Sequence, residues 1–99
     1  MSDDLLQIDV VDDHDARVLV VSGELDPSTA PDLASRLSGL EGTVVLDLRG
    51  IRFVDSSGLR TLIGVSAELG DRLVLRAPSP VVTRLFDLTG IAEHFTIEP

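Results

Sequence analysis

The sequence predicts a single small α/β domain, in which a mixed β-sheet is covered by amphipathic helices. Short apolar runs typical of buried strands, such as 18–21 and 44–48, alternate with segments whose apolar residues recur at helical spacing. The 99 residues fit one domain over 1–99, and this alternation uses almost all of them. A hydrophobic content of 43% suffices for a core, and no cysteine is available to reinforce it.

The first quarter of the chain predicts a hairpin that leads into a central strand. Apolar and polar residues alternate over 6–10, as in a half-buried strand. A polar turn follows at 12–15, and the β-branched run 18–21 indicates a fully buried strand. The segment 23–27, Gly-Glu-Leu-Asp-Pro, is expected to end that strand.

The next segment predicts a helix that begins after Thr29. Its apolar residues share one helical face; they are Ala30, Leu33, Ala34, Leu37 and Leu40. Thr29 is the expected N-cap, and Asp32 lies where a carboxylate can serve the free N–H groups of the first turn. Pro31 is tolerated in that turn, and Gly39 and Gly42 mark the end of the helix.

The remaining chain repeats the alternation of strand and helix. Strands are expected at 44–48 and 73–75, and residues 50–54 connect the first of these to the next helix. That helix ends at Gly70 and has an apolar face formed by Leu59, Leu62, Ile63 and Ser66. A third helix, outlined by Val81, Val82, Leu85 and Phe86, stops at Gly90, and a short strand follows around Phe95 and Ile97. The predicted order is β-β-α-β-α-β-α(-β).

The charge composition disfavours nucleic acids and membranes as partners. All 8 basic residues are Arg and 17 residues are acidic, so the formal net charge is −9 at pH 7. Such a domain repels phosphate backbones and anionic lipids, and we expect no direct nucleic-acid binding and no membrane association. The acidic first residues lack the basic character of a secretory signal, so we expect a cytoplasmic protein. With no unexplained apolar segment, we expect a monomer.

Most catalytic signatures are missing from the sequence. A chain without Lys has no P-loop, and one without Cys has no thiol nucleophile or Cys-ligated metal. His14 and His94 show no spacing that places either beside a serine as a general base. The run Asp12–Asp15 offers carboxylates and an imidazole to a cation, although a solvated turn is the simpler interpretation. We therefore expect no enzyme activity, no cofactor and no metal.

One segment, Asp55-Ser56-Ser57-Gly58, is a candidate functional site. It lies between a predicted strand and a predicted helix, where α/β domains usually place their sites. In one interpretation its hydroxyls or carboxylate only cap the first helical turn. In another, a phosphate on one of these serines adds about −1.5 to −2 charges, which the helix dipole and free N–H groups accept. Partner binding would then change without a change in fold.

In their context these residues resemble a known family. The runs Gly23–Asp26, Val45–Leu48 and Phe53–Leu59, in this spacing and element order, are similar to the STAS domain of anti-sigma factor antagonists (anti-anti-sigma factors). The resemblance implies that Ser57, the second serine of its pair, is phosphorylated by an anti-sigma factor with serine-kinase activity. The unphosphorylated antagonist binds that partner and frees the sigma factor. Phosphorylation ends the binding, and a PP2C-type phosphatase restores it.

The resemblance also implies a partner-binding surface around Ser57. Its members match positions of the family; they are Asp26, Asp55, Ser56, Gly58, Leu59 and Arg60. Arg60 departs from the glycine often found there and lies one helical turn from Ser57, where a cation can pair with a phosphate. Asp26 is equally well interpreted as a residue that starts a helix, and Leu59 as a core residue.

Two further hypotheses are compatible with the sequence. If the strand ends align, Glu24, Asp26 and Asp55 are expected to cluster around Ser57. The alternative function is a STAS module that binds its partner without phosphorylation, as in stress-signalling or lipid-transport complexes. An enzyme is disfavoured, because no base is expected beside the serine.

Overall fold

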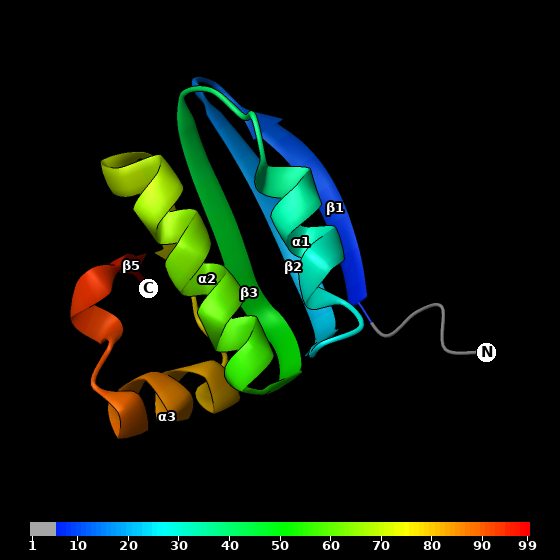
Figure 1. The fold of residues 1–99 in the computed structure, drawn as a ribbon. Coiled ribbons are helices and arrows are strands. Elements are labelled where there is room, and N and C mark those ends of the chain that lie inside the picture. The colour runs from blue at the N-terminus through cyan, green and yellow to red at the C-terminus, as the bar shows by residue number, and fades with distance from the viewer. Residues whose placement is uncertain (1–5) are drawn as a thin grey trace.

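The computed structural model describes residues 6–99, which form one five-stranded sheet flanked by helices (Figure 1). The strand order is β1-β2-β3-β4-β5; β1 is antiparallel to β2, and the other neighbours are parallel. The predicted α/β class and element order are therefore confirmed, including the short last strand. The elements are β1 (Leu6–Asp13), β2 (Ala16–Leu25), α1 (Ala30–Leu37), β3 (Thr43–Val54), α2 (Ser56–Leu69), β4 (Leu73–Arg76), α3 (Pro80–Thr89) and β5 (Thr96–Glu98), with short 3₁₀ turns at Gly70–Arg72 and Ala92–His94.

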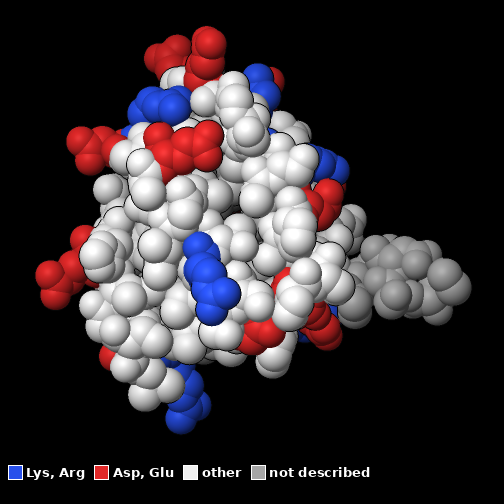
Figure 2. All heavy atoms as spheres, viewed as in Figure 1, with Lys and Arg blue, Asp and Glu red and all other residues white. Residues whose placement is uncertain are grey.

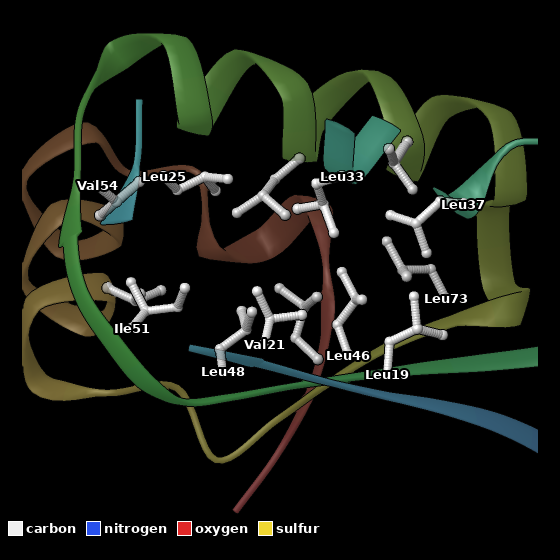
Figure 3. Packing of buried hydrophobic residues seen from close by; sticks show 14 of the residues in the cluster. Leu19, Val21, Leu25, Leu33, Leu37, Leu46, Leu48, Ile51, Val54 and Leu73 are labelled. Atoms are coloured by element: carbon white, nitrogen blue, oxygen red, sulfur yellow. The ribbon is translucent and has the colours of Figure 1, made fainter. Parts of the chain in front are cut away.

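The core lies between one face of the sheet and the helices. Every second residue points to it over 19–21 of β2 and 44–48 of β3, as the two-residue period of a strand requires. Its fully buried members from β2, α1 and β3 include Leu19, Val21, Leu33, Leu37, Leu46 and Leu48 (Figure 3). Burial of each such side chain stabilises the fold by about 1.5–3 kcal/mol. Helix α3 adds Val82 and Phe86 to the same cluster, and Phe86 stacks on Phe95 with 5.1 Å between ring centroids.

Two strands run further than the sequence predicts. Gly23-Glu24-Leu25 does not end β2 but belongs to it, and β3 continues through the segment 50–54 that was expected to be a connection. The physical reason is the pairing of the two segments, in which Leu25 lies opposite Val54 after a shift in register near Gly50. A Cβ atom at Gly50 would lie 2.7 Å from the Cβ of Ser22, so the close approach of the two strands at this pair requires glycine.

Helix α2 buries a face that overlaps the predicted one only in part: Leu59 and Leu62 are buried as expected, but Ile63 and Ser66 are not part of the buried stripe. Ile63 is 39% exposed, whereas Val65 is 6% exposed. The buried residues are Gly58, Leu59, Leu62, Val65 and Leu69, a stripe rotated away from the one containing Ser66. Ser66 instead donates a hydrogen bond from its hydroxyl to the carbonyl oxygen of His94, at 3.0 Å.

The hairpin at the N-terminal side has a shorter turn than expected. Only residues 14 and 15 lie outside the strands, and the side chain of Asp12 pairs with that of Arg17 at 2.7 Å. Within residues 6–99 no group of three or more acidic or histidine side chains could hold a metal ion.

The first strand is less buried than its pattern predicts. Val10, expected in a half-buried strand, is 50% exposed, while Leu6 and Ile8 pack against the core. No helix in the described part is long and apolar enough to cross a membrane.

Candidate functional site

The parallel ends of β2 and β3 bring two distant aspartates to the same edge of the sheet. Leu25 and Val54 are paired, and the backbone N–H of Asp55 donates to the carbonyl oxygen of Leu25 at 3.2 Å. Asp26 and Asp55 therefore follow neighbouring strand ends, each at the start of a helical segment. Figure 3 shows Leu25 and Val54 side by side below the first turn of α2. This edge is where open α/β sheets usually carry their sites.

Asp55 caps α2. Its Oδ1 atom accepts hydrogen bonds from the backbone N–H groups of Ser57, at 2.8 Å, and Gly58, at 3.2 Å. The sequence offers three candidate capping groups, the Asp55 carboxylate and the hydroxyls of Ser56 and Ser57. Only the carboxylate caps the helix. Within the described part of the chain, neither hydroxyl hydrogen-bonds to another protein group. Ser56 is exposed and Ser57 is half-buried.

Asp26 organises the turn before α1. Its Oδ1 accepts from the Ser28 hydroxyl at 2.7 Å, from the Ser28 N–H at 2.9 Å and from the Thr29 N–H at 3.2 Å. The Ser28 hydroxyl, followed by the backbone donors, lowers the pKa of the Asp26 carboxyl, which partial desolvation opposes. Thr29 occupies the predicted N-cap position, but its side chain caps nothing. Its hydroxyl donates to the carbonyl oxygen of Glu24 at 2.8 Å and ties the turn to β2.

A groove lies between the start of α1 and the first turns of α2. It is open to solvent, has a volume of about 320 Å³ and is lined by Pro27, Ala30, Pro31, Ser57, Arg60 and Thr61. Ser57 belongs to this wall and Ser56 does not. The structure thus brings two of the predicted site residues, Ser57 and Arg60, to one surface. The wall from α1 was not predicted as part of the site, because nothing local links it to a serine 26–30 residues further along the chain.

Arg60 is the cation of this groove. Its side chain is exposed, and no carboxylate within residues 6–99 lies within 4.0 Å of it. Helix α2 contains no other basic residue. Figure 2 shows one basic side chain near the centre of the face in view, with acidic and further basic side chains toward its edges.

Gly58 and Leu59, which were predicted as members of the partner-binding surface, are both buried. Leu59 is 9% exposed and belongs to the core cluster. A Cβ atom at Gly58 would lie 2.7 Å from Cγ and 2.9 Å from the carbonyl oxygen of Leu25. Glycine therefore lets α2 approach β2 closely enough to place the cap and Ser57. These two residues position the site and offer no side chain to a partner.

The expected acidic cluster around Ser57 is only partly formed. The carboxylates of Asp26 and Asp55 are turned toward the N–H groups of their own helical segments. Glu24 lies opposite Phe53 in the sheet, out of phase with Leu25 and Val54, which point into the core. None of the three acidic residues belongs to the wall of the groove. These three carboxylates are therefore outside the lining of the groove, which includes the cation Arg60.

Neither histidine is near Ser57. His14 lies in the turn before β2, and β2 spans 10 residues between that turn and the site edge, or roughly 30 Å. The backbone of His94 contacts Ser66, which is nine residues beyond Ser57 on α2, or roughly 13 Å along the helix. A serine-based hydrolytic site needs a base within hydrogen-bond reach of the hydroxyl.

Comparison with known proteins places this geometry in a family. A family model described as "Mlab, STAS domain" matches residues 8–98. The chain is 34% identical over 93 residues to the anti-sigma-B factor antagonist of Listeria monocytogenes, covering 87% of this chain and 82% of the relative. It is 30% identical over 82 residues to the anti-sigma F factor antagonist of Lysinibacillus sphaericus, covering 75% and 70%.

Solved structures agree with the sequence relatives. An anti-sigma factor antagonist from Mycobacterium paratuberculosis superimposes with a TM-score of 0.86 and 30% identity, over 98% of this chain and 88% of that one. The Bacillus cell fate determinant SpoIIAA in its phosphorylated form shares the fold, with a TM-score of 0.67 and 23% identity over 93% and 89% of the two chains. The chain therefore belongs to the STAS domain family, among the anti-sigma factor antagonists.

Proposed function

We propose that the chain antagonises an anti-sigma factor and that phosphorylation of Ser57 switches this activity off. Unphosphorylated, it binds an anti-sigma factor with serine-kinase activity, which then releases its sigma factor. Phosphate on Ser57 ends the binding, and a PP2C-type phosphatase restores it. The observation that carries the proposal is that Ser57 lines an open groove while its hydroxyl takes no part in the helix cap.

The related proteins support this reading of the site. The relatives antagonise anti-sigma factors, as their names say, and a protein with the same fold has been solved in a phosphorylated form. Because the cap is made by Asp55, the Ser57 oxygen can be modified without loss of a hydrogen bond that holds the fold. A phosphate would add about −1.5 to −2 charges to the surface that a partner covers.

The chemistry of the switch is a phosphoryl transfer. A bond forms between the Ser57 oxygen and the γ-phosphorus of ATP, and the bond from that phosphorus to the bridging oxygen of ADP breaks. The hydroxyl proton passes to a base of the kinase, since neither histidine of this chain lies near Ser57. The phosphatase reverses the result with water, which yields serine and inorganic phosphate.

The surface that we propose for the partner has two kinds of members. Ser56, Ser57 and Arg60 present side chains to solvent or to the groove and would be contacted directly. The remaining predicted residues act by placing these three; they are Asp26, Asp55, Gly58 and Leu59.

The test uses anti-sigma factors with a kinase fold from the organism that encodes this chain, each purified and mixed with the protein, Mg²⁺ and ATP. Mass spectrometry maps the phosphate, and calorimetry measures the affinity before and after phosphorylation. We expect phosphate on Ser57 in the parent and in Ser56→Ala, none in Ser57→Ala, and at least a tenfold loss of affinity on phosphorylation. Ser57→Asp should also have a lower affinity for the partner than the parent.

Two outcomes would overturn the proposal. One is stable binding to such a partner with no phosphate on Ser57. The other is equal affinity of the phosphorylated and unphosphorylated forms. Binding and sigma-factor release that Ser57→Ala and Ser57→Asp leave unchanged would instead identify an interaction module that works without phosphorylation.

A further inference from the structure

Most N–H groups in the first turn of α2 are not free to receive a phosphate as the sequence suggests; only the N–H of Ser56 has no acceptor among the described residues. The expectation there is that free N–H groups at the helix start accept it. In the structure the N–H groups of Ser57 and Gly58 already donate to the Asp55 carboxylate, and the N–H of Leu59 donates to the Asp55 carbonyl at 3.0 Å. A phosphate on Ser57 would meet an occupied cap and a neighbouring negative charge, which repels it.

Arg60 supplies a positive group for the phosphate, which the helix cap does not. It lies three residues after Ser57 on α2, a spacing that puts two side chains on the same helical face with about 5–6 Å between their Cβ atoms. Both residues line the same groove. Since no carboxylate in the described residues pairs with Arg60, its guanidinium is available. A guanidinium binds phosphate oxygens through two parallel hydrogen bonds, which a serine phosphate can accept.

We propose that Arg60 holds the phosphate of phosphorylated Ser57 within the same chain. The inference rests on the proposed function, because it concerns the phosphorylated state. It also extends the switch: before phosphorylation the groove presents a free cation to a partner's acidic group, and afterwards that cation is engaged. Phosphorylation thereby removes the one positive group of the groove wall and adds a negative one.

The experiment places phosphoserine at position 57 of the full chain during translation, so it needs no kinase. Titration followed by ³¹P NMR measures the second pKa of the phosphate. Arg60 stabilises the dianion, so we expect this pKa to be about 0.5–1 unit lower in the parent than in Arg60→Gln. Arg60→Lys keeps the charge but loses the paired hydrogen bonds, and it should give an intermediate value.

A control substitution makes the result specific. Arg84→Gln removes another exposed arginine, one on α3 that does not line the groove, and it should leave the phosphate pKa unchanged. Circular dichroism verifies that each variant folds, which is expected because Arg60 is exposed.

An equal phosphate pKa in the parent and Arg60→Gln would overturn the inference, as would an equally large shift in Arg84→Gln. Failure of the proposed function has a different signature. In that case the kinase reaction leaves Ser57 unmodified, whereas the titration of the installed phosphoserine still depends on Arg60.

Discussion

The Oδ1 atom of Asp55 lies 2.8 Å from the backbone nitrogen of Ser57, and this contact separates the two roles that the segment could have had. The carboxylate closes the start of α2, so the serine hydroxyl is left free at the edge of a groove. Asp55 thus has the structural role, and Ser57 is left for the proposed regulatory role. A substitution of one residue can therefore remove its role and leave the other in place.

Loss of the Asp55 carboxylate should destabilise the domain. Asp55→Ala leaves the N–H groups of Ser57 and Gly58 without their acceptor and should reduce the free energy of unfolding by about 1 kcal/mol. Asp55→Asn retains an acceptor oxygen and should cost less. Urea denaturation followed by circular dichroism measures both. Glu68→Ala, an exposed change at the other end of α2, is the control and should stay within about 0.5 kcal/mol of the parent. Equal stability of Asp55→Ala and the control would contradict the role of Asp55 as the cap.

Alanine should have opposite effects at two glycines of α2. At Gly58 the new methyl group would meet Leu25 at 2.7 Å and force strand and helix apart, at a cost of about 1–3 kcal/mol. At Gly64 the same methyl group meets nothing within 4 Å, and the higher helix propensity of alanine should stabilise by about 0.5–1 kcal/mol. Thermal unfolding of the two variants distinguishes these signs. A neutral Gly58→Ala would show that α2 does not approach β2 this closely.

The extent of the strands was the least predictable part of the fold. The stripes of α1 and α3 follow from local spacing, because residues such as Leu33 and Phe86 lie on the face that their own helix buries. Where β2 ends depends on Leu25 pairing with Val54, which is 29 residues away in the chain. Gly23 and Gly50 look like strand terminators to a local rule, yet both lie inside paired strands.

The residues of the site that lie in one local run were predictable from the sequence, but their hydrogen bonds and the neighbouring wall were not. Ser57, Asp55 and Arg60 stand in one local run, so the sequence alone brings them together. Which of three side chains makes the cap depends on the orientation of the Asp55 carboxylate, which no pattern reports. The wall contributed by α1 comes from the packing of two helices. The exposure of Ile63 likewise depends on how α2 packs on the rest of the fold, because Leu59, Leu62 and Val65 are the residues that it buries.

The turn before α1 should show a pH dependence that Ser28 controls. The Ser28 hydroxyl is the largest cause of the lowered pKa of Asp26, so Ser28→Ala should raise that pKa toward 3.8, as measured by NMR titration of the carboxyl carbon. A carboxyl whose pKa is lower in the folded state stabilises the fold above its unfolded pKa, and the stabilisation is lost as pH falls through the folded pKa. Any stability cost of Ser28→Ala should therefore be complete above about pH 5 and shrink below about pH 4. Ser35→Ala, exposed on α1, should leave the Asp26 titration unchanged. A cost of Ser28→Ala that grows as pH falls would contradict this assignment.

Changes at Ser57 itself should leave the fold intact. The Ser57 hydroxyl makes no hydrogen bond within the described residues, and its N–H is satisfied by Asp55 whatever side chain it carries. Ser57→Ala should therefore stay within about 0.5 kcal/mol of the parent in urea denaturation. In Ser57→Asp the new carboxylate is favoured by the helix dipole, by about 0.3–1 kcal/mol, and disfavoured by Asp55, so we expect a net change of less than about 1 kcal/mol. Circular dichroism spectra should coincide for all three proteins. A larger loss of stability in Ser57→Ala would mean that the hydroxyl holds the first turn of α2, and a weakened partner interaction could then no longer be assigned to charge at this position.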